Sequence, residues 1–349
     1  MKSKMNKEVY IIGEIGQNHN GSVDIAKLIA ELCSRTPTAE IDIQPMNAVK
    51  LTKRDLAHEL ANSHMSRPYD SPNSFGKTYG EHREYLELSD EEHFEVYKHA
   101  KSLGLEFVET LCAPSCLTLL GLFMPDRLKV ASRDLTNLPL LQAMAETKIP
   151  MILSTGMSDK AELDQALEVI TKEHDQVSIL HCVSQYPTHP TNLNLQTITY
   201  LKNEYPDYDI GFSDHTIGIA APSVAVGMGA TIIEKHITID RNMKGTDQKG
   251  SLGPDGVLRM VRDIRITEQW MGEYGMFIED DVKAAKTKLR RSIATNKKLA
   301  AGSTITEADI HLLSPGDGFT WSQKQELVGR TLTTTLATDE IIYPKHLNS

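Results

Sequence analysis

The 349-residue chain lacks the features that mark several classes of protein. Its four cysteines show no framework spacing and no Cys-x-x-Cys motif, so reduced thiols are expected. No stretch approaches the roughly 18 consecutive apolar residues of a membrane span, and the short charged start before Val9 is unlike a signal peptide. Lys and Arg (37) are fewer than Asp and Glu (47), which argues against a nucleic-acid partner. These absences predict a cytoplasmic protein that binds neither membrane nor nucleic acid.

Short apolar and β-branched runs alternate with segments whose apolar residues recur at helical spacing. The expected strands are Val9–Ile15, Ala48–Leu51, Glu106–Leu111, Leu128–Ala131, Pro150–Leu153, Val177–Leu180, Asp209–Phe212 and Thr231–Ile233. The expected helices are Val23–Cys33, Asp90–Leu103, Leu138–Lys148, Asp159–Lys172, Leu193–Glu204, Ile217–Gly229 and Asp255–Met271. Buried strands joined by helices form parallel sheets, and eight such units can close, so the pattern predicts an α/β protein with a (β/α)₈ TIM barrel.

The helical pattern stops near Tyr274, and the rest of the chain has a different character. Residues 279–288 are rich in charge and are expected to form a solvated linker. Beyond them, Arg291–Ala294 and Val328–Leu336 are predicted as short strands between Gly- and Pro-containing turns. The predicted organisation is a barrel over residues 1–278, a linker over 279–288 and a small β-rich domain over 289–349.

Most of the expected strands end in a side chain capable of catalysis or binding. These residues are Glu14, Lys50, Thr110, Lys129, Ser132, Ser154, His181, Ser213, His215, Glu234 and His236. Active sites of TIM barrels lie at the C-terminal strand ends, so the residues are expected to line one pocket. His215 and His236, on successive strands, suit one divalent ion with coordination positions left open. For either histidine alone, an ordinary hydrogen-bonded strand-end residue remains the alternative.

An ordered series of motifs resembles the sialic acid synthase family. In the barrel the motifs are Glu14–Gly21, Arg67–Tyr69, Gly76–His82, Lys129–Ser132, Leu153–Met157, His181-Cys182, Tyr186-Pro187, Ser213–Thr216, Glu234–His236 and Gly245–Gln248. The tail, through Arg291-Ser292, Ser314–Gly318 and Val328-Gly329, resembles that family's antifreeze-like (SAF) domain. The resemblance covers nearly the whole chain. It implies a transferase that condenses phosphoenolpyruvate with an N-acylmannosamine, its 6-phosphate or a related aldose and releases phosphate.

The resemblance also implies roles for individual residues. Phosphoenolpyruvate would be held by Lys50, Thr110, Lys129, Ser132, Ser154 and Ser213, because a buried anion needs cations and hydroxyls around it. The implied catalytic residues are Glu14, Asp134, His215 and His236, and the implied sugar contacts are Thr52, Tyr186 and Asp247. His215 and His236 would bind Mn²⁺, with Mg²⁺ or Co²⁺ as alternatives. A homodimer is implied in which the SAF domain is swapped and covers the partner's site. For Asp247 and the serines, loop or helix-capping roles remain alternatives.

Three positions depart from the family pattern. The family has a lysine at the end of strand two, and counting from Gly21 reaches Asp42 whereas counting from Arg67 reaches Lys50. Asp cannot hold a phosphate, so Lys50 is chosen, which implies an eight-residue insertion around Pro37–Asn47. Thr52 stands where many members carry Gln, and Ser314 stands where bacterial N-acetylneuraminate synthases carry an Arg that contacts the sugar's acyl group.

Two other functions remain open from the sequence. Lys129 on a barrel strand is placed as in a class I keto-acid aldolase that forms a Schiff base. A non-enzymatic sugar-binding protein built on the SAF domain is the second alternative, although the spread of ionisable groups over eight strand ends argues against it.

Overall fold

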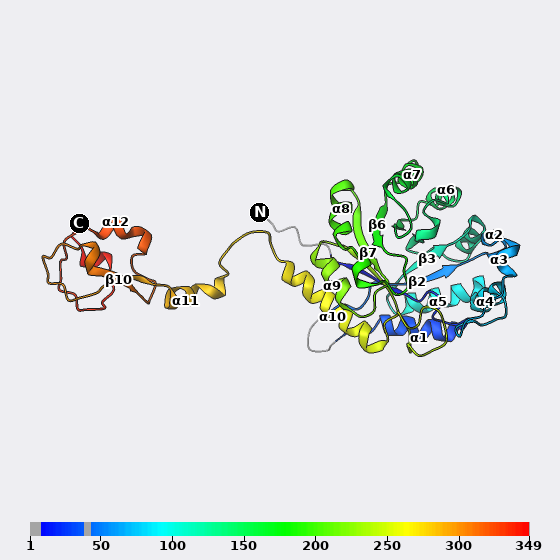
Figure 1. The fold of residues 1–349 in the computed structure, drawn as a ribbon, viewed down its shortest axis with the longest axis horizontal. Helices are drawn as coiled ribbons and strands as arrows, with labels where there is room; N and C mark the ends of the chain where they lie inside the picture. Colours follow the sequence, from blue (N-terminus) through cyan, green and yellow to red (C-terminus); the bar gives the residue numbers. More distant parts are fainter. Residues whose placement is uncertain (1–7, 38–42, 349) are drawn as a thin grey trace. The chain divides into compact units, whose positions relative to one another are not determined.

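The computed structural model describes residues 8–37 and 43–348, so Asp42 and the rest of 38–42, within the expected insertion, lie outside the described residues. The chain divides into two compact units, Met1–Gly272 and Glu273–Ser349 (Figure 1). Among the helices of the described ranges, none combines the length and the apolar content of a membrane span.

The first unit is a closed barrel of eight parallel strands. In chain order they are β1 (Tyr10–Glu14), β2 (Ala48–Lys53), β3 (Glu106–Leu111), β4 (Arg127–Val130), β5 (Met151–Ser154), β6 (Val177–Cys182), β7 (Asp209–Asp214) and β8 (Ile232–His236). Each strand pairs with the next, and β8 pairs with β1, with Glu14 opposite His236. This closed order of eight parallel strands confirms the predicted TIM barrel. Parallel strands are buried on both faces, which is why helices surround them.

Helices of the first unit connect these strands, and α10 follows the last of them. They are α1 (Val23–Cys33), α2 (Leu56–Glu59), α3 (Asn62–Met65), α4 (Tyr79–Leu86), α5 (Asp90–Ser102), α6 (Leu138–Glu146), α7 (Lys160–Ile170), α8 (Gln196–Glu204), α9 (Ala220–Gly227) and α10 (Pro254–Met271). Three of them begin at capping boxes, which satisfy two free backbone N–H groups at once. The pairs are Thr78 with Glu81 at α4, Ser89 with Glu92 at α5, and Asp159 with Glu162 at α7.

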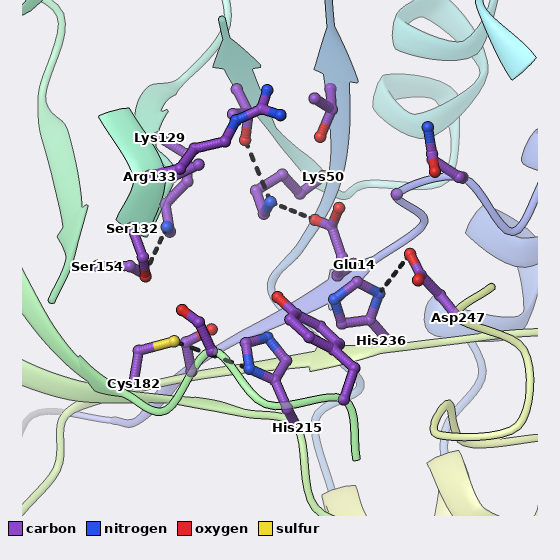
Figure 2. Close-up of a pocket in the computed structure, with 18 of the residues that line it drawn as sticks. Glu14, Lys50, Lys129, Ser132, Arg133, Ser154, Cys182, His215, His236 and Asp247 are labelled. Atoms are coloured by element: carbon purple, nitrogen blue, oxygen red, sulfur yellow. Dashed lines mark hydrogen bonds and ion pairs between the residues drawn. The ribbon is translucent and has the colours of Figure 1, made fainter. Parts of the chain in front are cut away.

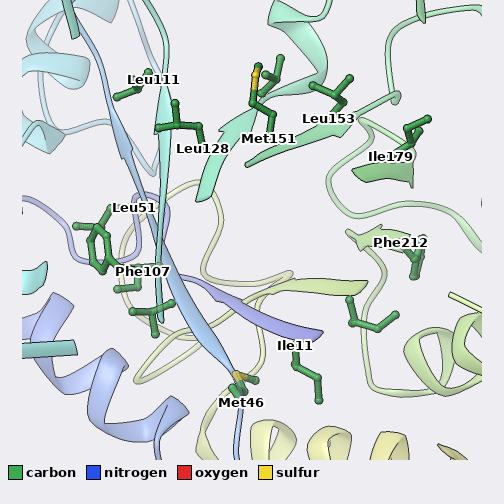
Figure 3. Close-up of a cluster of buried hydrophobic side chains, with 14 of the residues drawn as sticks. Ile11, Met46, Leu51, Phe107, Leu111, Leu128, Met151, Leu153, Ile179 and Phe212 are labelled. Atoms are coloured by element: carbon green, nitrogen blue, oxygen red, sulfur yellow. The ribbon is translucent and has the colours of Figure 1, made fainter. Parts of the chain in front are cut away.

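Alternate residues of each strand face either the helices or the barrel interior. The outward side chains, such as Ile11, Leu51 and Phe107, form a continuous apolar cluster with the helices (Figure 3). Inside the barrel, six side chains form a separate apolar layer: Ile12, Ala48, Val108, Ile152, Leu180 and Ile232. This layer forms the floor beneath the strand ends.

The second unit is small and has its own core. Strands β9 (Ser292–Thr295) and β10 (Ile310–Leu313) pair antiparallel, and short helix α12 (Lys324–Leu327) follows. The segment expected as a charged linker contains helix α11 (Asp280–Leu289), supported by the Asp280–Lys283 ion pair one turn apart. The strand expected at Val328–Leu336 is wrong. Residues 328–336 form isolated bridges rather than a strand, because their backbone meets several different segments.

Candidate active site

A cavity of about 450 Å³ opens at the C-terminal ends of the barrel strands (Figure 2). Every strand contributes a side chain to its lining: Glu14, Lys50, Thr110, Lys129, Ser154, Cys182, Ser213 and Glu234. Just after β1, Gly16 with φ of 51° turns the chain two residues beyond Glu14. A Cβ at Gly16 would lie 2.9 Å from Glu14 Oε1, so glycine keeps the space beside this carboxylate open.

Lys50 lies at the centre of a buried charge network. Only 5 % of the residue is exposed, and its ammonium pairs with Glu14 and lies 3.7 Å from Glu234 Oε2. Nζ also donates a hydrogen bond of 3.1 Å to Thr110 Oγ1. A buried lysine is stable only when it is paired and hydrogen-bonded, and these three groups from three other strands meet that need.

Lys129 forms a second, hydroxyl-rich centre on the other side of the cavity. Its Nζ donates to Ser154 Oγ at 2.6 Å and to the Val130 carbonyl at 2.9 Å. Burial lowers the pKa of Lys129. Nearby, the Ser132 hydroxyl accepts from the Gly156 N–H at 3.0 Å, and Figure 2 shows Ser132 and Ser154 beside the lysine. Two ammonium groups with several hydroxyls form a set suited to oxyanions.

Glu14 and Glu234 are both buried, but their pKa values diverge. Burial, reinforced by the negative charge of Glu234, raises the pKa of Glu14 to about 7 despite its contact with Lys50. Burial also acts on Glu234, but Lys129, Lys50 and a 2.9 Å hydrogen bond from Ser213 outweigh it and lower the pKa to about 2. Divergent pKa values in a carboxylate pair are a sign of separate acid–base roles. Glu14 is therefore the group able to gain or lose a proton near neutral pH, while Glu234 stays ionised.

The two predicted metal-binding histidines lie side by side, with ring centroids 5.5 Å apart. His215 donates from Nδ1 to the Val183 carbonyl at 2.9 Å, which leaves Nε2 with its lone pair free for a ligand. Nδ1 of His236 is buried without a hydrogen-bond partner, and Asp247 Oδ2 lies 3.9 Å from it. Within residues 8–37 and 43–348, no three His, Cys, Asp or Glu side chains form a complete ligand set. The histidine pair, with the unpartnered Nδ1 of His236 and the carboxylates of Glu14 and Glu234 lining the same cavity, nevertheless fits a divalent ion with open positions.

The remaining predicted residues have mixed placements. Thr52, Tyr186 and Asp247 line the cavity, and the Tyr186 ring lies 4.0 Å from the His215 ring. Asp134 does not line it, because its carboxylate accepts from Arg133 Nε at 3.2 Å and Arg133 is the residue that reaches the cavity. Ser314 belongs to the second unit and donates to the Leu289 carbonyl at 3.1 Å.

Seven further polar residues line the cavity and were not predicted from the sequence: Gln17, Arg54, Tyr79, Arg83, Arg133, Ser184 and Thr246. Gln17 and Tyr79 lie inside motifs that signalled the family, and Arg54 follows β2 by one residue. Arg83, on α4, carried no such signal because α4 was not predicted as a helix.

The chain matches two protein-family models. The model of the NeuB family matches residues 43–275. The chain belongs to the NeuB family. A SAF-domain model matches residues 290–348, in agreement with the resemblance seen in the tail.

Relatives of this NeuB-family chain extend over nearly its full length. It is 32 % identical to an N,N'-diacetyllegionaminic acid synthase of Legionella pneumophila, covering 97 % of this chain and 95 % of that protein. It is 30 % identical to an N-acetylneuraminate-9-phosphate synthase of Mus musculus, with 97 % and 93 % covered. A solved N-acetylneuraminic acid synthetase of Leptospira borgpetersenii superposes with a TM-score of 0.67 at 27 % identity, covering 82 % of this chain and 94 % of that one. The chain is accordingly an enzyme of the synthase type in a family of sialic, legionaminic and pseudaminic acid synthases.

Proposed function

We propose that this NeuB-family enzyme condenses phosphoenolpyruvate with an N-acylmannosamine, its 6-phosphate or a related aldose and releases inorganic phosphate. The observation that carries the proposal is the pair of buried lysines, Lys50 and Lys129, surrounded by hydroxyls at the closed end of the cavity. A substrate with a phosphate and a carboxylate supplies two anionic groups for two cationic centres. The names of the relatives support the same reaction class.

Binding of the anionic substrate would redistribute the charges around Lys50. In the free enzyme Lys50 is shared between Glu14 and Glu234. Because the pKa of Glu14 is about 7, this carboxyl takes up a proton readily when a second anion approaches. Lys50 is then free to hold an oxyanion of phosphoenolpyruvate, while Lys129 and Ser154 hold the other end.

The bond changes follow from this placement. The C3 carbon of phosphoenolpyruvate attacks the aldehyde carbon of the acceptor, and a carbon–carbon bond forms. The aldehyde oxygen takes the proton that Glu14 gained on substrate binding and becomes a hydroxyl, which leaves Glu14 ionised. Water then adds to the resulting cationic C2 and gives up a proton to Glu14. The C2–O bond to phosphate then breaks, and inorganic phosphate leaves with its bridging oxygen. Lys50 and Lys129 hold the oxyanions in place throughout.

His215 and His236 would hold a divalent ion, for which we propose Mn²⁺. A bound ion at this position acts as a Lewis acid that polarises the acceptor's aldehyde. Tyr186, packed against His215, closes one side of the imidazole pair and shields it from bulk water. Thr52, Tyr186 and Asp247 line the space left for the sugar hydroxyls.

The test is phosphate release from phosphoenolpyruvate against N-acetylmannosamine, its 6-phosphate, mannose and diacetamido hexoses. Release that depends on one of these aldoses supports the proposal, and no release with any of them contradicts it. Bridging ¹⁸O in phosphoenolpyruvate should appear in the phosphate. A class I aldolase would instead be trapped on Lys129 by borohydride with a keto acid, and such trapping would favour that alternative.

The metal assignment has its own test with a matched control. Chelation should abolish phosphate release and Mn²⁺ should restore it, with Mg²⁺ and Co²⁺ compared in parallel. His236→Ala should weaken Mn²⁺ binding measured by calorimetry. His181→Ala is the control, because His181 lies near the end of β6 at the same end of the barrel but donates to the Leu193 carbonyl at 2.8 Å and does not line the cavity. Equal loss of Mn²⁺ binding in both variants would contradict the assignment.

We further propose a homodimer in which the SAF domain of one subunit covers the partner's cavity. Support comes from the family resemblance and from the SAF-domain match over residues 290–348. Light scattering should give twice the chain mass of 38.8 kDa. Deleting the residues after Asp281 should reduce activity and sugar selectivity more than barrel stability. A monomer, or a truncated barrel with unchanged kcat and KM, would contradict this arrangement.

A further inference from the structure

Asp214 and Lys235 form a buried ion pair next to the proposed metal-binding residues. They lie opposite each other on β7 and β8, and their exposed fractions are 1 % and 0 %. Lys235 Nζ lies 2.7 Å from Asp214 Oδ2. Asp214 directly precedes His215 in the sequence and Lys235 directly precedes His236, but neither member of the pair lines the cavity. The pair therefore lies outside the cavity, on the two strand ends that carry the histidines.

The ion pair extends into a closed set of hydrogen bonds around His215. Asp214 Oδ1 accepts from the Thr216 N–H at 2.7 Å, and Lys235 Nζ also donates to the Thr216 carbonyl. Lys235 thus reaches from β8 to the residues on both sides of His215. We call Asp214, Thr216 and Lys235 the clasp.

The two histidines differ in how the barrel backbone holds them. His236 is the last residue of β8 and pairs with Glu14 on β1, so it belongs to the sheet. The pairing of β7 with β8 ends at Asp214 and Lys235, so His215 lies one residue beyond the strand. Contacts other than the sheet must therefore fix the direction of His215.

Two further hydrogen bonds of His215 go to the loop that follows β6. Nδ1 donates to the Val183 carbonyl at 2.9 Å, and the His215 carbonyl accepts from the Thr188 N–H at 3.0 Å. The clasp instead ties the segment around His215 to β8, the strand that carries His236. It is therefore placed to set the distance between the two imidazoles.

Stability alone is a weak reason for such a pair. Removing two charges from water offsets much of their attraction, and a neutral pair of similar volume is often as stable or more stable. Charge-assisted hydrogen bonds do, however, fix the geometry of the groups that they join. The clasp therefore indicates that this place in the barrel requires a defined geometry.

We propose that Lys235 and Asp214 are positioning residues that hold the imidazoles of His215 and His236 at the spacing a divalent ion requires. This inference rests on the proposed metal site. The two residues act through the backbone on either side of His215. Ligands held at a fixed spacing bind an ion more tightly, because less conformational freedom is lost on binding.

The first test is the double variant Lys235→Met with Asp214→Asn. It removes both charges at similar volume and keeps an amide oxygen for the Thr216 N–H. The Kd for Mn²⁺, measured by calorimetry without substrates, should rise about 10- to 100-fold. The urea midpoint of the metal-free protein should stay the same or rise. A Kd within about two-fold of that of the unmodified enzyme would overturn the proposal, whatever the change in stability.

The chain offers a matched control at the end of β2. Lys53 Nζ lies 2.6 Å from Asp90 Oδ1 and donates to the Leu88 carbonyl at 3.1 Å, and neither Lys53 nor Asp90 lines the cavity. Lys53→Met with Asp90→Asn removes the same charges at a strand end that carries neither histidine. The Kd for Mn²⁺ should stay within about two-fold, and a loss equal to that of the first double variant would overturn the proposal.

Asp214→Glu provides a second variant that keeps both charges. Its carboxylate is displaced by one methylene group, so the pair can form but its geometry changes, and the Kd for Mn²⁺ should rise by a smaller factor. If the double variant fails to fold, an unchanged Kd for Asp214→Glu overturns the proposal. Absence of Mn²⁺ binding by the unmodified enzyme would instead overturn the metal assignment on which this inference rests.

Discussion

Two layers inside the barrel lie only two residues apart along the same six strands but have opposite chemistry. The lower layer is Ile12, Ala48, Val108, Ile152, Leu180 and Ile232. Two residues further on, the same strands place Glu14, Lys50, Thr110, Ser154, Cys182 and Glu234 in the cavity. Because successive side chains of a strand point to opposite faces, residues two apart both point into the barrel and differ only in their depth within it.

The comparison shows how the barrel separates stability from chemistry. The side chains of the apolar layer stabilise the barrel by filling its interior with matching shapes. The effect of replacing one of them on stability can therefore be predicted from that residue alone. The polar layer is a network in which Lys50, Glu14 and Glu234 hold one another in place. Removing one member leaves the others buried and unpaired, whereas removing an apolar side chain leaves a cavity.

The largest effect is expected when the polar layer loses Lys50. Lys50→Met keeps the volume but leaves Glu14 and Glu234 facing each other without their shared cation. Breaking a buried ion pair in this way should lower the free energy of unfolding by about 3–5 kcal/mol at pH 8. Phosphate release should also be lost, since an anion then meets two carboxylates. Urea unfolding and the phosphate assay measure the two effects.

The unfolding experiment with Lys50→Met has a built-in control. The double variant Lys50→Met with Glu14→Gln removes one of the two stranded carboxylates and should regain part of the lost stability. If the single variant were as stable as the unmodified enzyme, the network interpretation of the polar layer would be wrong.

The barrel was predictable from the sequence because its strands are apolar on both faces and its helices are amphipathic. The helix α4 (Tyr79–Leu86) was missed because it has few apolar residues and lies within a long connection between β2 and β3. The helix α11 (Asp280–Leu289) was not predicted because charge dominates its composition. In the second unit, the strand β10 (Ile310–Leu313) was missed because it is only four residues long. The surrounding chain consists of short turns and isolated bridges, which leave little periodicity in the sequence.

The site was predictable where a strand carries the residue. Counting along the sequence gave two candidate positions for the family's lysine, Asp42 and Lys50. Lys50 lies opposite Glu14 on the neighbouring strand, and this pairing places Lys50 in the cavity. Loop residues could not be ranked, because their direction depends on contacts far away in the sequence. Asp134, placed by motif alone, turns to Arg133, while Arg83 reaches the cavity from a helix that no pattern indicated.

The second prediction tests the apolar layer. Leu180→Ala should lower the free energy of unfolding by about 2–4 kcal/mol, because a fully buried leucine leaves a cavity that its neighbours fill only in part. The kcat and the KM for phosphoenolpyruvate should stay within about two-fold, since Cys182 and the polar layer keep their positions. Urea unfolding and steady-state kinetics check both statements. A large loss of kcat in folded protein would show that the layers are not separable.

The third prediction concerns the part of the pH dependence of stability that comes from Glu14. The pKa of Glu14 is about 7 in the folded enzyme against a usual value of 4.5, so between these values the folded state carries more protons. Its contribution to stability therefore falls as pH rises from 4.5 to 7 and is constant outside that window. Buried histidines act in the opposite direction, so the difference between the unmodified enzyme and Glu14→Gln is the quantity to measure.

The difference in unfolding free energy between the unmodified enzyme and Glu14→Gln should change by about 1–2 kcal/mol between pH 5 and 6.5. Urea unfolding at each pH measures it. Glu109→Gln is the control, because Glu109 is equally buried but faces His93 outside the cavity. A flat difference for Glu14→Gln across the window would contradict the raised pKa.

The smallest effect is expected from a single hydroxyl at the boundary of the two layers. Thr110→Val removes the oxygen that accepts from Lys50 at 3.1 Å but leaves the ion pairs of Lys50 in place. The loss should be about 1 kcal/mol of unfolding free energy, with a rise of a few-fold in the KM for phosphoenolpyruvate. Val108→Thr, two residues earlier on β3, makes the opposite exchange and buries a hydroxyl among apolar side chains. It should cost more, about 1–3 kcal/mol, with an unchanged KM, because no partner awaits that hydroxyl in the apolar layer. If Thr110→Val proved the more destabilising of the two, the boundary between the layers would lie lower on β3 than Val108.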